Sequence, residues 1–199
     1  AVAQNLTIYL DSAGQATIAA DSVDGGTTGL CSVDSIAISI DNFNCNDAGD
    51  TVMIVFSAFD QSNNEDTAHA YIIVRDTIGP DVQPFSSIDV YLDANGQATI
   101  TPTMVDSATT DACGIDSLWI DSSAFDCANV GSPLTVTLSA RDVNNNVWSN
   151  TTTVNIHDTL SPDVNVFSAL TVALDSSGLA SITPQMIDSA SSDACGIQF

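Results

Sequence analysis

Basic side chains are nearly absent from this chain, which contains no lysine. Arg75 and Arg141 are its only basic residues besides two histidines, whereas 25 residues are acidic and the formal net charge at pH 7 is −23. A surface this acidic repels the phosphates of nucleic acids and of anionic lipids. We therefore expect no nucleic-acid partner, while calcium ions and cationic surfaces are suitable ones.

Long apolar runs and familiar catalytic motifs are also missing. The longest apolar run, Val52–Phe56, is far shorter than the roughly 20 residues of a membrane-spanning helix, so we expect no membrane insertion. No GxSxG, HExxH or P-loop pattern occurs, and we expect no enzyme. The 44% hydrophobic content nevertheless predicts a folded chain and not a disordered acidic tail.

One stretch, Leu92–Cys127, recurs with an 82-residue period. It matches Leu10–Cys45 without a gap, and residues 174–199 begin a further copy. Residues 1–82 and 83–164 are identical in 29 of 82 columns. A fixed period of this kind is typical of tandem arrays. We predict one domain at 1–82, a second at 83–164 and the start of an incomplete third at 165–199, as a piece of a longer chain.

The cysteines recur with the same period. Cys31 and Cys45 are 14 residues apart, as are Cys113 and Cys127, whereas Cys195 has no partner at that spacing. This recurrence favours one disulfide within each repeat, which closes a loop worth roughly 3 kcal/mol in the chain-entropy model. Such bonds indicate an oxidising, extracellular compartment. Zinc is the alternative, but there is no CxxC motif and neither histidine recurs.

Short, regularly spaced strand patterns predict an all-β fold, an antiparallel β-sandwich in each repeat. No stretch is typical of a long amphipathic helix. Asn95–Gly96 gives a strong hairpin signal between the first two strands of its repeat. In the first repeat the predicted strands are Asn5–Asp11, Gly14–Ala20, Ile36–Ile40, Thr51–Asp60 and Ala68–Asp76.

The repeat resembles a known family. Its pattern includes Leu92–Ile100, Asp111–Ile115, Cys127, Ala140–Asp142 and Asp158–Val164. These segments are similar to the Ig-like, HYR-type tandem repeats of giant secreted Bacteroidota adhesins, and the likeness covers the whole chain. The resemblance implies seven-stranded Ig-like sandwiches that serve as spacers or adhesive modules at the cell surface. The first repeat departs from the pattern at two positions, where Gly29 and Ser32 stand in place of Asp and Gly.

Aspartates gather where successive repeats should meet. With the usual strand order of a sandwich, the end of one repeat faces two loops of the next, and hard oxygen ligands from separate loops suit Ca²⁺. The alternative is that these residues only form turns. We predict structural calcium at both joints, with Asp76, Asp81, Asp106, Asp111, Asp142 and Asn144 as ligands at the first and Asp158, Asp163, Asp188 and Asp193 at the second.

One sheet face differs between the repeats. Val52, Ile54, Phe56 and Ala58 alternate with outer residues that are apolar in the first repeat, where the second has Thr135, Thr137, Ser139 and Arg141. An exposed apolar face usually meets a partner, so we predict association with another copy or with a neighbouring repeat; the alternative is a covering loop. The predicted assembly face consists of Met53, Val55, Phe59, His69, Tyr71, Ile73 and Trp119.

Asp followed by Ser or Thr and an apolar residue also recurs, which is similar to the O-glycosylation signal of Bacteroidota. A chain rich in these residues also produces such triplets by composition alone. The candidate glycan acceptors are Ser12, Ser22, Ser35, Thr51, Thr67, Thr77, Ser107, Ser117, Thr159 and Ser189.

Together these patterns predict a structural, self-assembling extracellular protein at the cell surface, part of a fibre, filament or adhesin stalk. The alternatives are a module that binds a glycan or another ligand through Trp119 and the adjacent loops, and a non-catalytic appendage of a secreted enzyme.

Overall fold

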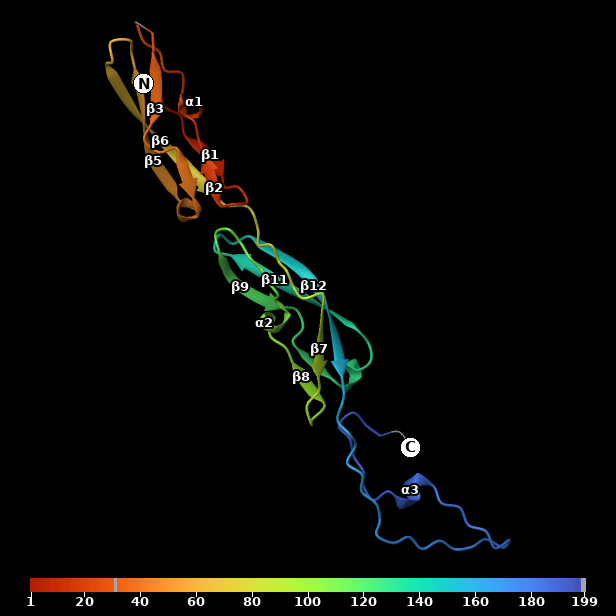
Figure 1. Ribbon diagram of the computed structural model, residues 1–199. Helices are drawn as coiled ribbons and strands as arrows, with labels where there is room; N and C mark the ends of the chain where they lie inside the picture. Colours follow the sequence, from red (N-terminus) through yellow and green to blue (C-terminus); the bar gives the residue numbers. More distant parts are fainter. Residues whose placement is uncertain (31, 198–199) are drawn as a thin grey trace. The chain divides into compact units, whose positions relative to one another are not determined.

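The computed structural model describes residues 1–30 and 32–197, and its regular secondary structure is mostly β-strand (Figure 1). Within these ranges the only α-helices are the single turns Ala20–Val23 (α1), Pro102–Val105 (α2) and Pro184–Ile187 (α3). Two 3-10 turns, Cys45–Asp47 (η1) and Cys127–Asn129 (η2), follow short strands. The prediction of an all-β chain without long helices is confirmed.

The chain forms two compact units. Unit 1 comprises Ala1–Gln83, Ala108–Trp119 and Ser139–Asn150. Unit 2 comprises Pro84–Ser107, Ile120–Leu138 and the chain from Thr151 onward. Each unit thus combines segments on both sides of a predicted repeat boundary, and the boundaries at residues 82 and 164 stay predictions.

Two sheets enclose the core of unit 1. The larger has the order β1-β6-β5-β3, and the smaller pairs β2 with β4. Leu10, Val23, Phe43, Ile54, Phe56, Ile72 and Val74 pack between them and are nearly inaccessible to solvent. The strands are β1 (Leu6–Tyr9), β2 (Gln15–Thr17), β3 (Ser35–Ile38), β4 (Asn42–Asn44), β5 (Thr51–Phe59) and β6 (Glu65–Arg75). The described part of residues 1–82 therefore has six named strands where the family resemblance implied seven, and β4 was not predicted.

The long hairpin of β5 and β6 shows why the sequence alternates. Ile54 and Phe56 are fully buried, whereas Met53, one position before Ile54, keeps 53% of its surface exposed. The register places Met53 opposite Tyr71, which is 47% exposed. Successive strand residues point to opposite faces, so the predicted inner and outer sets of β5 are both confirmed.

The first two strands do not form the predicted hairpin. β1 pairs in parallel with β6, and β2 pairs antiparallel with β4. The tight turn between β1 and β2 therefore carries the chain from one sheet to the other. Asp11 closes this turn because its Oδ1 accepts the backbone N–H groups of Ala13 and Gln15. A glycine at the tight position fixes the turn but does not decide which strand becomes the neighbour of β1.

The later strands follow the same order. β7 (Ser87–Tyr91), β12 (Val147–His157), β11 (Leu134–Asp142) and β9 (Ile115–Ile120) form one sheet in this sequence, and β10 (Ala124–Asp126) pairs with β8 (Gln97–Thr99). β7 again runs parallel to the last strand, here β12. From Asp158 to Ile197 the structure has no named strand, and isolated bridges such as Asp163–Ser192 join this segment to itself.

Candidate functional site

Two disulfides join cysteines that the sequence had assigned to different repeats. Cys45 is bonded to Cys113 and Cys127 to Cys195, each across a sequence separation of 68 residues. The predicted pairs, Cys31 with Cys45 and Cys113 with Cys127, are therefore wrong, and Cys31 itself lies outside the described residues. The bonded Cα atoms are 5.1 Å apart in both cases, within the usual range for a disulfide.

Strand geometry explains why Cys113 does not bond Cys127. Between them the chain runs through β9 and then β10, and β9 alone carries it roughly 20 Å at about 3.3 Å per residue. β10 then pairs with β8 in the smaller sheet. Along this path the chain passes from unit 1, which contains Cys113, into unit 2, which contains Cys127.

A glycine in the sheet-crossing turn makes room for each cystine. Gly14 has φ +71°, and a Cβ placed there would collide with the Cys45 Sγ. Gly96 has the same φ, and its Cβ would lie 2.6 Å from the Cys127 Sγ. These glycines are required both for the left-handed backbone and for the close approach of the sulfur. The sequence showed that both glycines recur at the 82-residue period, but not that they lie against the cysteines.

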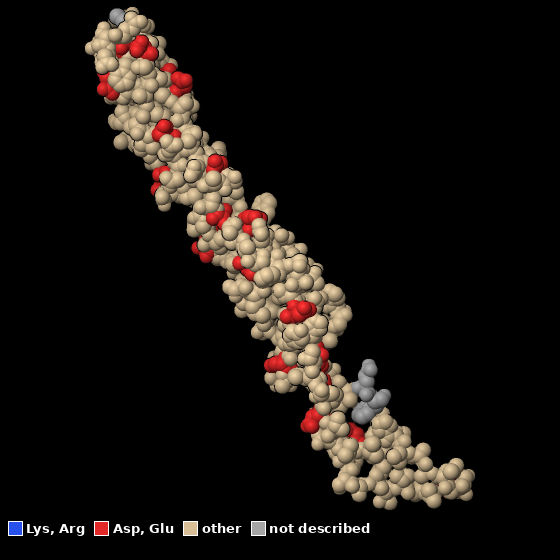
Figure 2. All heavy atoms as spheres, in the orientation of Figure 1, with Lys and Arg blue, Asp and Glu red and all other residues tan. Residues whose placement is uncertain are grey.

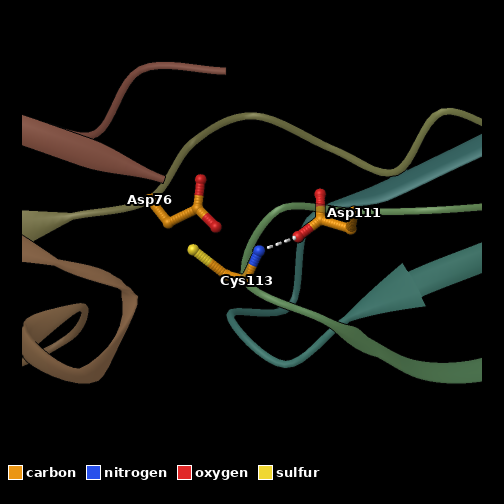
Figure 3. A group of neighbouring side chains, drawn as sticks. All are labelled: Asp76, Asp111 and Cys113. Atoms are coloured by element: carbon orange, nitrogen blue, oxygen red, sulfur yellow. Dashed lines mark hydrogen bonds between the residues drawn. The ribbon is translucent and has the colours of Figure 1, made fainter. Parts of the chain in front are cut away.

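Two carboxylates meet beside the first disulfide. One oxygen each of Asp76 and Asp111 and the Sγ of Cys113 lie within 4.8 Å of one another. Figure 3 shows Asp76 on the segment after β6, with Asp111 and Cys113 on the loop before β9. Because Cys113 is bonded to Cys45, its sulfur is not a thiolate and cannot act as a strong metal ligand. We call Asp76 and Asp111 the first acidic cluster.

The electrostatics of this cluster are unfavourable for ionised carboxylates. Burial raises the pKa of Asp76, the N–H of Ile78 partly offsets that rise, and the nearby charges of Asp111 and Asp142 raise the pKa further. Asp111 is held in place because its Oδ1 accepts the backbone N–H groups of Cys113 and Gly114. A cation between the two carboxylates would remove their mutual repulsion.

The turn between β11 and β12 adds polar groups to the same unit. Asp142 is 1% exposed, and its carboxylate accepts the N–H groups of Asn144 and Asn146 and the side-chain amide of Asn146. The amide of Asn146 also donates to the backbone oxygens of Asp76 and Ile78, each at 3.3 Å. Asn144 Oδ1 is buried and has no hydrogen-bond partner among the described residues. Asn146 was not singled out in the sequence, because an Asn-rich turn resembles ordinary turn composition.

The remaining predicted ligands of the first joint have other roles. Asp81 accepts the side-chain amide of Gln83 at 2.5 Å, and its backbone pairs with Thr110. It nevertheless lines the same hollow as Asp76 and Asp111. Asp106 belongs to unit 2 and forms the C-cap of α2, beside Pro84. Its place in a shared calcium site stays a prediction.

A second acidic cluster, Asp158 and Asp193, repeats the first. One oxygen of each lies within 4.8 Å of the other and of Cys195 Sγ, which is bonded to Cys127. Asp163 and Asp188 are not members of this group. Asp163 accepts the amide of Asn165, and Asp188 accepts the N–H of Ser191. The structure thus brings together one pair of the predicted carboxylates at each position.

Other acidic groups are scattered over the surface. The face drawn in Figure 2 shows separate patches of Asp and Glu and no Lys or Arg. Arg141 forms an ion pair with Asp116, with Nη2 and Oδ2 2.6 Å apart. No dense basic patch accompanies the acidic clusters in the described ranges, which agrees with the composition.

The predicted assembly face lies partly in solvent. Met53 and Tyr71 are about half exposed and Trp119 is 41% exposed. His69 is exposed too, while Val55, Phe59 and Ile73 are half-buried. Within unit 1, Val55 pairs with His69 in the register that joins Met53 to Tyr71. No loop of the described residues seals these two cross-strand pairs from water, so the covering-loop alternative does not account for them.

The ten candidate glycan acceptors are accessible. Eight are exposed, and Ser117 and Ser189 are half-buried. Their modification is not tested by the structure and stays a prediction.

The chain has no match to a family model or to a curated protein. Among solved structures it is similar to the protocadherin GammaB4 extracellular domain, with 14% identity over 85% of this chain and 34% of that chain and a TM-score of 0.38. It is also similar to protocadherin Gamma B7 cadherin domains 1–4, with 10% identity over 87% of this chain and 54% of that chain and a TM-score of 0.33. A three-Ig structure of titin has 9% identity over 81% of this chain and 67% of that one, with a TM-score of 0.29.

These neighbours are cadherin and Ig-like domains, and the chain spans about a third and about half of the two protocadherin chains. Because the TM-scores are low, the assignment to the all-β class rests on the strand pairing described above. No helix in the described ranges is long and apolar enough to cross a membrane. The two disulfides are typical of proteins from oxidising, extracytoplasmic compartments.

Proposed function

We propose that this chain is a non-catalytic structural protein of the cell exterior, a segment of a surface fibre or long adhesin stalk made of Ig-like repeats with an 82-residue period. The disulfide pattern carries the proposal. Both bonds link cysteines of successive repeats, so they tie one repeat to the next instead of stapling a repeat to itself. A stalk needs such ties because a single-chain linker alone leaves a hinge.

Polar and packing contacts in unit 1 support the same role. The Asn146 amide holds the backbone oxygens of Asp76 and Ile78. The backbone of Gly79 lies against Trp148, since a Cβ on Gly79 would be 3.5 Å from the indole Cε3. The chain that leaves β6 is therefore fixed at three successive points and by the disulfide beside them. Each contact restricts bending at this position.

A calcium ion would add a further contact to the chain that leaves β6. The residues present fit the ion, because the first acidic cluster offers two carboxylates, Asp142 adds charge nearby, and Asn144 Oδ1 is a buried oxygen without a partner among the described residues. Ca²⁺ accepts carboxylate and amide oxygens from separate loops with flexible geometry. The second acidic cluster supplies an equivalent pair.

Thermal unfolding in calcium and in EDTA tests this part of the proposal. An ion present at 100 times its dissociation constant would stabilise the fold by about 2.7 kcal/mol. We expect Asp76→Asn with Asp111→Asn to lose the part of this gain that comes from the first acidic cluster, while Asp34→Asn, which removes an exposed charge beside β3, keeps all of it. Equal melting temperatures in calcium and EDTA for the unaltered chain would exclude the ion.

The exposed face of the β5–β6 hairpin provides the contact for self-assembly with other copies or neighbouring repeats. Met53 and Tyr71 face each other across the hairpin and are both about half exposed. The corresponding residues one period later are Thr135 and Thr153. Large exposed apolar pairs are usually covered by a partner, and only one of the two repeats has them.

Electron microscopy tests assembly directly. We expect regular filaments from the purified chain in calcium, and straighter ones than in EDTA. Met53→Thr with Tyr71→Thr should disperse them without unfolding the chain, because it copies the second repeat. Thr135→Ser with Thr153→Ser serves as the matched control and should leave them intact. Filaments that survive the first pair of substitutions would refute this face as the contact.

A further inference from the structure

The two disulfides shorten the covalent path along the chain. A stretching force that reaches Cys45 is transmitted through the disulfide to Cys113 and bypasses the chain between these two residues, which are 68 positions apart. It then follows the 14 residues to Cys127 and passes through the second bond to Cys195. One 82-residue period is thus crossed by a 14-residue segment and one cystine.

The segments off this path contain most of the sandwich. The whole β5–β6 hairpin lies between Cys45 and Cys113, as do β7 and β8. β11 and β12 lie between Cys127 and Cys195. Only β9 and β10 remain on the path between Cys113 and Cys127. The buried residues of β5 and β6, including Ile54, Phe56 and Ile72, therefore belong to strands that a longitudinal pull does not peel apart.

The short path limits extension. Fourteen residues stretched to about 3.5 Å each, plus one cystine, reach roughly 54 Å per period. Without the disulfides the 82 residues would reach roughly 290 Å. The longest strand of a repeat, β6 with 11 residues, is already about 36 Å long at 3.3 Å per residue. The oxidised array therefore has little length to release, even if every hydrogen bond on the path broke.

Pairing within a repeat would not have this effect. A bond across the 14-residue spacing removes only that short segment from the path and leaves the 68-residue remainder of each period free to unravel. The two pairings share Cys45, Cys113 and Cys127 but give opposite mechanical behaviour. The observed pairing is the one that leaves the smallest extensible length.

We propose that the disulfides form a tension path that limits how far each period from cystine to cystine can extend under longitudinal force. This inference rests on the proposed role as a fibre or stalk, which is the setting in which such a force acts. The 14-residue segments between the cystines bear the tension. The hairpins outside the path keep their fold and their outer faces while the chain is pulled.

Single-molecule force spectroscopy of the full chain, held at its two ends, tests the proposal. At about 3.5 Å per residue, the oxidised chain should reach a contour length of only roughly 22 nm, and the chain in dithiothreitol roughly 69 nm. Cys45→Ser with Cys113→Ser should release one bypassed segment, which adds about 23 nm at the same rise. Cys127→Ser with Cys195→Ser should add the same amount.

Cys31→Ser is the matched control and should leave the oxidised length unchanged. An oxidised chain that extends as far as the reduced one would overturn the proposal, as would a length increase in Cys31→Ser. These outcomes are separate from those of the microscopy. A limited extension without any filament would refute the proposed assembly and support the tension path. Filaments of freely extensible chains would support the assembly and refute the tension path.

Discussion

Trypsin digestion without reductant distinguishes the two disulfide patterns sharply, because the chain has only two cleavage sites. Cleavage after Arg75 and Arg141 yields residues 1–75, 76–141 and 142–199. Cys45 lies in the first fragment, Cys113 and Cys127 in the second and Cys195 in the third. The observed bonds should therefore hold all three together after digestion in denaturant with free thiols blocked. Mass spectrometry should find one species near 20.6 kDa that separates into three on reduction.

The same bonds set a magnitude for stability. Closing a loop of 68 residues removes enough chain entropy from the unfolded state to stabilise the fold by about 4 kcal/mol. Urea unfolding of Cys45→Ser with Cys113→Ser should show a loss near this value, while Cys31→Ser should unfold like the unaltered chain. Three separate tryptic fragments without reductant, or a large loss in Cys31→Ser, would refute the reasoning because both require bonds within a repeat.

Individual residues provide three further tests. Asp76→Asn should stabilise the calcium-free protein at neutral pH, because the raised pKa means that ionised Asp76 disfavours the fold. The difference in stability should disappear below the ordinary aspartate pKa of 3.8, where the carboxyl is protonated in both the folded and the unfolded state. Melting temperatures measured across pH test this. Gly14→Ala should destabilise the fold more than Gly178→Ala does. Both glycines have positive φ, so the backbone strain is shared, but only Gly14 has the Cys45 sulfur where a new Cβ would lie. Overpacking of this kind costs about 1–3 kcal/mol; chemical denaturation compares the two variants, and equal losses would contradict the packing argument. The natively produced chain should weigh more than 20.6 kDa if the Asp-Ser/Thr sites carry glycans, and an unmodified intact mass would reject them.

Strand parity was predictable, and cysteine pairing was not. Alternation along Val52–Ala58 identified the buried face of β5 because a half-buried strand leaves a period of two in its sequence. The cysteines recur at both a 14-residue and a 68-residue spacing, so the periodic pattern fits either pairing. Only the path of β9 and β10 excludes the shorter one. The leftover Cys195 was a usable signal, since the 68-residue spacing gives it a partner.

The candidate site was predicted in part for a similar reason. The strand order of a sandwich was enough to bring Asp76 near Asp111, because both positions follow from where β6 ends and β9 begins. It was not enough to place Asp106, which caps a one-turn helix in unit 2. Asn146 was missed because its role depends on the amide reaching the backbone of Asp76, and such a contact leaves no trace in residue spacing.

Aspartates with lowered and with raised pKa values differ in what stabilises their charge, and this difference indicates where a cation would act. Asp60, Asp93 and Asp175 each accept backbone N–H groups two and four residues later. The side-chain amide of Asn64 is the main cause of the lowered pKa of Asp60, and the backbone N–H groups are the main cause for Asp93 and Asp175. Their charge is stabilised by the turn itself, and the fold loses this support only as the pH falls through their lowered pKa values. Asp76 is opposite, because burial and neighbouring carboxylates raise its pKa. Local turns therefore stabilise part of the negative charge of this chain, whereas a calcium ion beside the first cystine would offset a repulsion that disfavours the fold.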